Sequence, residues 1–285
     1  MHFRSGTNVG IINTPTAGSG IDFDGGSGTF LVSAPTSSSP QDRGRLVQNG
    51  PHRVYSETGK RPIEFGSDSP ETFLAFGEFD NTPNSHHYNP HAGDYVAGTA
   101  KLWGPSRNKG RNIYGALHYL KDKVTEQSML LWNSGGDGDN VSPYTGNPGN
   151  NTGYQSNTFD VSKLAQWENV FRYMDTIGLG MHFKLQETEN DQFMDNNAVL
   201  GNQRKLYYSE MIARFGHHLN INWNLGEEHD RFNSHAQEAN ALNQTGNYVA
   251  SVDPYESARV VHTYPDEHGI YTELYGASGV TGTSG

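Results

Sequence analysis

The sequence contains no cysteine in its 285 residues, which excludes disulfide bonds, thiolate metal ligands and a cysteine nucleophile. It also lacks any apolar run near the roughly 20 residues that span a bilayer, and its first residues carry no apolar signal core. Basic residues are scarce: the chain has 20 Lys and Arg against 31 Asp and Glu, which gives a formal net charge of -11. This balance argues against a nucleic-acid partner and against binding to an anionic membrane surface.

Glycine, aromatic and amide side chains are abundant instead. The chain has 34 glycines, its aromatic fraction is 11%, and asparagine recurs throughout. Aromatic rings stack on the C–H faces of sugars, while amides and carboxylates hydrogen-bond sugar hydroxyls. The composition therefore suits a carbohydrate ligand, and the length allows one large domain or two small ones.

Two regions of different composition follow each other along the chain. Residues 1–59 are rich in Gly, Ser, Thr and Pro, with short strand-like stretches at 28–33 and 52–56, which predicts a β-rich N-terminal segment. Over residues 60–285 strands and helices alternate, which predicts an α/β fold with a parallel sheet. The expected strands are 61–66, 127–133, 181–186, 219–225 and 259–264. The expected helices are 113–123, 160–177, 203–217 and 234–250, with none after the fifth strand.

The strand expected at 219–225 is the centre of the functional argument. Three asparagines alternate there with apolar residues, a period of two that gives the strand one polar and one apolar face. Gly226 follows, and Glu227 and Glu228 then stand at the carboxyl end, where (β/α) barrels keep their chemistry. If the alternation continues past Gly226, Glu228 lies on the polar face toward the barrel interior and Glu227 on the apolar face. Glu228 is therefore the first candidate for a catalytic acid, with Glu227 beside it; the alternative is a solvated turn.

Other strand ends supply further candidate residues. The strand at 181–186 repeats the two-faced pattern, with His182 and Gln186 on its polar face and Glu187 just beyond its end. Two neighbouring strands with polar faces suit a barrel lined for a ligand, although a core histidine satisfied by its neighbours remains the alternative for His182. The loop that carries Asp137 is either a sugar-contacting loop or a glycine-supported turn. The residues expected to line a sugar cleft are Trp132, Asn133, Asp137, His182, Gln186, Glu187, His262 and Tyr264.

Three short motifs follow one another in chain order: Gly66-Ser-Asp68, Trp223-Asn-Leu-Gly-Glu-Glu228 and Val261-His-Thr-Tyr-Pro265. Together they resemble the apiosidase-like glycoside hydrolases, which are TIM (β/α)8 barrels of the large retaining clan that includes many cellulases and β-galactosidases. The resemblance implies that Glu228 is the general acid/base, that Asp68 is a sugar ligand, and that residues 1–59 are the remnant of a β-sandwich module or a linker. Glu227 departs from the clan's pattern, in which an asparagine at this place contacts the 2-hydroxyl of the sugar.

The resemblance also predicts how much of a barrel is present. In the clan the nucleophile is a second Glu at the end of the seventh strand, whereas five strands are expected here. A full barrel of about 250 residues that begins near residue 60 runs well past residue 285. We therefore expect an incomplete TIM (β/α)8-type barrel that stops after about strand five, with the nucleophile beyond this chain. Because retaining hydrolysis needs two carboxyl groups about 5–5.5 Å apart, the fragment alone is expected to be inactive.

The function that the resemblance implies is hydrolysis of a plant or algal polysaccharide or oligosaccharide by a retaining two-carboxylate mechanism. The alternative is a non-catalytic carbohydrate-binding protein on the same scaffold. A third hypothesis, a metal-dependent hydrolase that uses His86, His87, His182 and Glu residues, is weaker because no His-x-His or His-Glu-x-x-His pair lies on one element. We expect no metal and no cofactor, a carbohydrate partner without nucleic acid or membrane, and a secreted or periplasmic location. The oligomeric state stays open.

Overall fold

The computed structural model describes most of the chain after residue 38. The described residues are 29, 39–67, 69–133, 140–146, 158–187, 194–195, 200–228, 234–264 and 268–284. Two predicted sugar ligands, Asp68 and Asp137, lie outside the described residues, as does nearly all of the strand-like stretch at 28–33.

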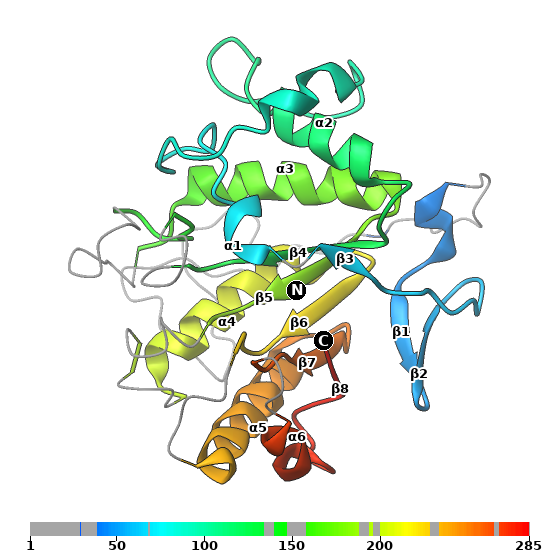
Figure 1. The fold of residues 1–285 in the computed structure, drawn as a ribbon, viewed down its shortest axis with the longest axis vertical. Coiled ribbons are helices and arrows are strands. Elements are labelled where there is room, and N and C mark those ends of the chain that lie inside the picture. The colour runs from blue at the N-terminus through cyan, green and yellow to red at the C-terminus, as the bar shows by residue number, and fades with distance from the viewer. Residues whose placement is uncertain are drawn as a thin grey trace.

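Within the described residues, the centre of the fold is a sheet of six parallel strands (Figure 1). Each strand pairs with the next one in sequence, in the order β3-β4-β5-β6-β7-β8, as in the wall of a (β/α) barrel. The strands are β3 Gly66–Ser67, β4 Glu126–Leu130, β5 Gly180–Lys184, β6 Ile221–Asn224, β7 Ala258–Val261 and β8 Gly282–Thr283. The α/β class and the incomplete TIM-type barrel predicted from the sequence are confirmed.

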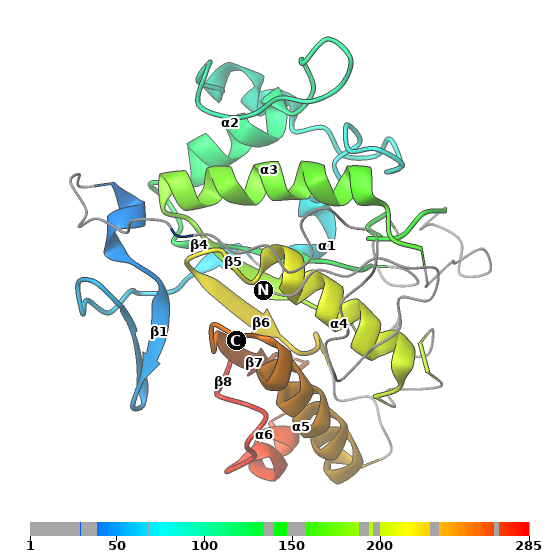
Figure 2. The ribbon, with the colours of Figure 1, turned by 180° about the vertical axis from the view of Figure 1, so that it is seen from behind.

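Helices connect the strands and cover the outer side of the sheet. They are α1 Pro70–Phe73, α2 Arg111–Leu120, α3 Val161–Ile177, α4 Asn202–Phe215, α5 His235–Val252 and α6 Gly269–Leu274, with short 3₁₀ helices η1 Pro40–Arg43 and η2 Asn89–Asp94. Neighbouring helices contact one another in sequence order from α2 to α6, and Figure 2 shows α3, α4 and α5 following one another across the sheet. Among the described helices, none combines the length and the apolar character needed to cross a bilayer.

Helix α3 shows how local sequence signals define an element. Asp160 caps its amino end by accepting a backbone N–H bond from the third residue of the helix at 3.0 Å, and Gly178 ends it with a left-handed φ of 77°. Between these ends, Leu164, Trp167 and Phe171 recur at helical spacing and are fully buried. The helix expected at 160–177 is therefore confirmed, and the structure places Trp167 in the core.

Strands β5 and β6 have two chemically different faces, as predicted. Phe183 and Trp223 belong to the hydrophobic core, and their rings stack with centroids 5.3 Å apart. Pairing places Lys184 directly opposite Asn224 on the next strand, so polar side chains meet on the other face of the sheet. The apolar face packs against the helices, and the polar face lines a cavity.

Two expectations about strands are wrong. Residues 61–65 form no strand, and only Gly66–Ser67 pairs with β4; Ile63 is 79% exposed, so no burial holds the stretch in the sheet. The expected count of five strands, with no helix after the fifth, is also wrong, because α6 and β8 follow β7. A two-residue strand is too short to show an alternating pattern, and β8 is defined by its pairing with Val260 of β7.

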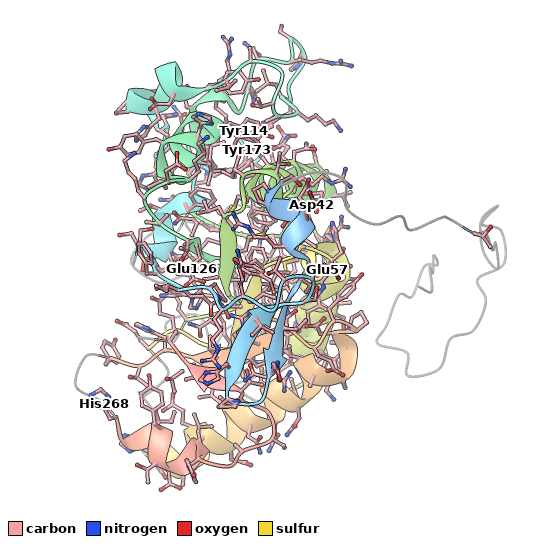
Figure 3. All side chains as sticks on the ribbon, turned by 90° about the vertical axis from the view of Figure 1, so that its right-hand side faces the viewer. Asp42, Glu57, Tyr114, Glu126, Tyr173 and His268 are labelled. Atoms are coloured by element: carbon pink, nitrogen blue, oxygen red, sulfur yellow. The ribbon has the colours of Figure 1, made fainter. Side chains whose placement is uncertain are left out.

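An antiparallel hairpin covers the amino-terminal end of the sheet. It consists of β1 Leu46–Asn49 and β2 His52–Tyr55. The backbone N–H of Leu46 donates to the carbonyl of Leu219 at 2.8 Å, and the guanidinium of Arg45 donates to the carbonyl of His217 at 2.8 Å. Both acceptors lie just before β6. Figure 3 shows the hairpin, in blue, in front of the strands. The described part of the N-terminal segment therefore docks directly on the barrel sheet.

Candidate functional site

The carboxyl ends of the strands surround a pocket of about 470 Å³. Its wall combines residues that follow β3, β6, β7 and β8, so both edge strands of the curved sheet contribute to the same hollow. Its titratable side chains are those of Glu71, Glu227, Glu228, His262, Tyr264, His268 and Tyr271. This is the end of a (β/α) sheet at which ligands bind, because the loops after the strands converge there.

A second cavity of about 460 Å³ extends along the polar face of the sheet toward the hairpin. Its most polar lining residues are Arg53, Glu64, Glu126, His182, Lys184 and Asn222. The two cavities share His262, Thr283 and Ser284 in their walls. They therefore adjoin, and together they form one hollow, here called the polar groove, from the hairpin to the carboxyl ends of the strands.

Glu227 forms a buried ion pair with Lys184 of β5, and their side chains are 10% and 2% exposed. Its backbone N–H donates to the carbonyl of Gln186 at 3.0 Å, which holds it beside the end of β5. The prediction that Glu227 lies on the apolar face is wrong, since its carboxylate meets a lysine of the polar face and lines the pocket. The alternation stops because the backbone N–H of Gly226 donates to the side-chain oxygen of Asn224 at 3.1 Å, in a turn that ends the strand.

Glu228 is half-buried in the wall of the same pocket. Its φ of 52° lies in the left-handed region, which residues other than glycine seldom occupy. A regular strand would place Glu227 and Glu228 on opposite faces, yet both line the pocket. Residues held in sparsely populated backbone conformations concentrate at active sites and ligand clamps. The outlier therefore makes this turn a candidate for the chemical centre of the pocket.

His182 is held in one orientation by a chain of hydrogen bonds. Asn224 uses its side-chain oxygen to accept from the backbone N–H of Gly226 at 3.1 Å, so its amide nitrogen faces His182 Nε2, also at 3.1 Å. His182 Nε2 therefore accepts, and Nδ1 carries the proton and faces Glu126 Oε1 at 3.4 Å. These contacts satisfy the ring, as the alternative interpretation requires, but the ring also lines the polar groove.

Glu126 is the hub of the polar groove, at the start of β4. Its carboxylate accepts from Asn222 Nδ2 at 2.9 Å as well as from His182. Burial raises the pKa of this carboxyl group, but hydrogen bonds from His182 and Asn222 and the charge of Arg53 outweigh burial and hold the pKa below its ordinary value. Arg53 also bonds the side-chain oxygen of Asn222 and pairs with Glu64 at 2.5 Å. The hairpin thus completes the network.

Three predicted sugar ligands are buried away from the polar groove. Trp132 is fully buried, with its ring centroid 6.0 Å from that of Tyr207 on α4. Gln186 accepts a hydrogen bond from Tyr208 Oη at 2.5 Å, also on α4. Asn133 is fully buried as well, and none of the three belongs to either cavity wall. The reason is that β4 and β5 end before these residues, so strand alternation no longer sets the direction of their side chains.

The other described candidates lie at or beside the groove. His262 and Tyr264 line the pocket, and Glu187 is buried next to Glu227, to which it is joined by an isolated β-bridge. Sequence reasoning missed some members of the groove wall. These are Arg53, Glu64, Glu126, Lys184 and His268. Lys184 alternates with apolar residues in the same strand as His182, so the sequence did indicate its polar face. The other four residues come from segments without a visible alternation of polar and apolar residues.

No protein-family model matches the chain, and no curated protein matches its sequence. Among solved structures, a putative glycoside hydrolase from Bacteroides vulgatus ATCC 8482 is 13% identical with a TM-score of 0.49, and the match covers 78% of this chain and 39% of that one. A glycoside hydrolase family 5 protein from the same organism is 12% identical with a TM-score of 0.49, covering 80% and 41%. A third structure, described as a glycoside hydrolase, is 13% identical with a TM-score of 0.47, covering 80% and 43%. The chain spans about two fifths of the length of these proteins, so the case for an activity depends on the groove itself.

Proposed function

We propose that the chain supplies the acid/base side of a retaining glycoside hydrolase active site. The observation that carries the proposal is the pair Glu227 and Glu228, which both line the pocket after β6 in a barrel-type parallel sheet. The motif that ends in Glu228 resembles the apiosidase-like family at this strand end. Retaining hydrolysis uses one carboxylic acid to protonate the leaving oxygen and a second carboxylate to attack the sugar, so a carboxylate-lined pocket is its first requirement.

The two glutamates take different roles. A general acid must carry a proton, whereas a carboxylate paired with a buried ammonium is an ionised acceptor. Glu228 is therefore the acid/base, and Glu227 with Lys184 is the fixed anion that accepts a sugar hydroxyl. The proposal assigns the nucleophile to a strand other than the six described here.

The lining of the polar groove supports a sugar substrate. Amide, imidazole and carboxylate groups from Asn222, His182 and Glu126 offer donors and acceptors to hydroxyls. Tyr264 and Tyr271 add aromatic rings at the carboxyl-end pocket. The substrate class we propose is a plant or algal polysaccharide or oligosaccharide, met by a secreted or periplasmic enzyme.

The substitution Glu228→Gln in the full-length protein tests the assignment. Turnover on a panel of plant and algal polysaccharides should fall by about 100-fold or more, because the general acid is lost. Sugar binding and the melting temperature should stay close to wild type, since the side chain keeps its size. Glu71→Gln, in the same pocket wall but on α1, is the matched control and should retain turnover. Full turnover by Glu228→Gln would sink the proposal.

A non-catalytic carbohydrate-binding protein on the same scaffold is the second candidate. It is favoured by Glu227, which stands where the clan has an asparagine and is closed into an ion pair with Lys184. It predicts that the wild-type protein binds sugars in calorimetry without cleaving any member of the panel. The metal-dependent hydrolase hypothesis has less support, because among the described residues His86, His87 and His182 belong to no group of three metal-ligating side chains.

A further inference from the structure

A cluster of metal-ligating side chains lies outside the polar groove. It consists of Glu168 in the middle of α3 and of His217 and His218 in the turn between α4 and β6. One ligand atom from each of the three lies within 4.8 Å of the others, and no other such group occurs in the part of the chain that the structure describes. The two histidines precede β6, whereas the candidate catalytic glutamates follow it, so the cluster and the pocket belong to opposite ends of that strand.

The spacing of the ligand atoms matches a tetrahedral metal site. His217 Nε2 lies 3.3 Å from Glu168 Oε1, and His218 Nε2 lies 3.2 Å from Glu168 Oε2. Ligands bound to one tetrahedral zinc ion at about 2.0–2.1 Å stand about 3.3 Å apart. An ion can therefore enter between the three side chains with little movement of the backbone.

Asp175 lies about two turns after Glu168 on α3 and orients the buried ring of His218. His218 is fully buried, and its Nδ1 lies 2.7 Å from Asp175 Oδ2. Asp175 is itself fixed, because Oδ1 accepts from the backbone N–H of Leu219 at 3.1 Å. When Nδ1–H donates to Asp175, Nε2 faces the Glu168 carboxylate at 3.2 Å, a contact that either a proton on Nε2 or a metal cation can bridge. A carboxylate behind a histidine in this way is the usual second support of a metal-bound imidazole.

The charges of the cluster also suit a divalent ion. Glu168 and Asp175 supply two negative charges, and neutral imidazoles add none. Arg172 donates to Glu168 Oε1 at 2.6 Å, but its side chain is 70% exposed and can turn into solvent when an ion binds. Arg45 directs its guanidinium to backbone carbonyls of the same turn and leaves the ligand atoms open.

We propose that Glu168, His217 and His218 bind one divalent transition-metal ion, with zinc as the best match to two imidazoles and a carboxylate. A water molecule completes the tetrahedron, and Asp175 holds His218 in place. The ion joins α3 to the turn before β6, the same turn on which the hairpin docks. Its role is structural, because none of its ligands lines the polar groove.

The test uses purified protein stripped with a chelator and then titrated with zinc chloride alone in a calorimeter at about pH 7.5, where free imidazole is neutral. One ion per chain should bind with a Kd of about 1 µM or tighter, and zinc should raise the melting temperature. His217→Ala should weaken binding by at least about tenfold and abolish the thermal shift. The ring of His217 is 41% exposed, so this variant keeps the fold.

Two further variants keep the test decisive. His52→Ala removes an exposed histidine of the hairpin and should bind zinc as the wild type does. Glu168→Gln should weaken binding as His217→Ala does, and cobalt in the wild-type site should give the strong visible absorption of a tetrahedral complex. The proposal is overturned if the wild type binds no zinc in the micromolar range, or if His217→Ala binds zinc as tightly as the wild type. An octahedral cobalt spectrum would overturn the assigned geometry.

Discussion

Lys184 and Glu227 form an ion pair that joins the last residue of β5 to the turn after β6, and both side chains are nearly inaccessible to water. The lysine comes from the polar face of the sheet, so it draws the glutamate away from the apolar face and into the wall of the pocket. Such a buried pair specifies position more than it adds stability, because the cost of desolvating two charges offsets much of their attraction. The geometry of the candidate site depends on this contact.

The first prediction concerns the loss of one partner. Lys184→Met removes the ammonium and keeps most of the side-chain volume, which leaves the Glu227 carboxylate buried without its cation. The free energy of unfolding, measured by urea denaturation, should fall by about 3–5 kcal/mol. The double variant Lys184→Met/Glu227→Gln should recover part of this loss. If the double variant loses the sum of the two single effects, the side chains are not coupled.

The second prediction follows from the left-handed backbone at Glu228. Glycine adopts a φ near 52° without the Cβ penalty, so Glu228→Gly should be more stable than Glu228→Ala by about 1 kcal/mol in chemical denaturation. Both variants should lack turnover, because both lose the carboxylate. Glu210 in the middle of α4 is the control, where glycine should instead be less stable than alanine by about 1 kcal/mol. Equal stability of the two variants at position 228 would contradict the backbone conformation.

The third prediction is a pH dependence at Glu126. Its folded-state pKa lies below the ordinary value, against the effect of burial, because His182, Asn222 and Arg53 stabilise the ionised form. The stabilisation is therefore present above the unfolded-state pKa of about 4.3 and is lost as the pH falls through the lower folded-state pKa. The stability difference between wild type and Glu126→Gln should be constant between about pH 5 and pH 7 and should shrink below about pH 4. Denaturant titrations across this range measure it, and a difference that persists at the acid end would refute the assignment.

The fourth prediction tests the packing of the segment that leads into β8. A Cβ added to Gly246 on α5 would lie 2.1 Å from the carbonyl oxygen of Gly279, a backbone atom that cannot move aside cheaply. Gly246→Ala should therefore destabilise the protein by about 1–3 kcal/mol and lower its melting temperature. Gly93→Ala, where a Cβ meets nothing within 4 Å, is the matched control and should be neutral or slightly stabilising. An unchanged melting temperature for Gly246→Ala would mean that this segment does not rest on α5.

Local patterns were sufficient to predict the elements that contain their own signals. The helix expected at 160–177 is confirmed, and its cap at Asp160, its apolar stripe and its glycine stop at Gly178 all lie within 19 residues of one another. The polar and apolar faces of β5 and β6 could also be predicted locally, because successive side chains of a strand point to opposite faces of the sheet. These patterns also placed Glu227 and Glu228 at the carboxyl end of a barrel strand.

Contacts between distant segments decided the rest. Arg53 meets Asn222 across 169 positions of the chain, and no spacing rule connects a hairpin to a strand so far away. The side of Glu227 was mispredicted because Lys184, 43 positions earlier, and the turn at Gly226 decide it once the strand has ended. Alternation holds only while backbone pairing continues, so side chains beyond a strand end take their direction from the partner that tertiary folding brings to them. The sequence by itself therefore determined the class of fold and the region of the site, and only the tertiary structure decided which side chains face the groove.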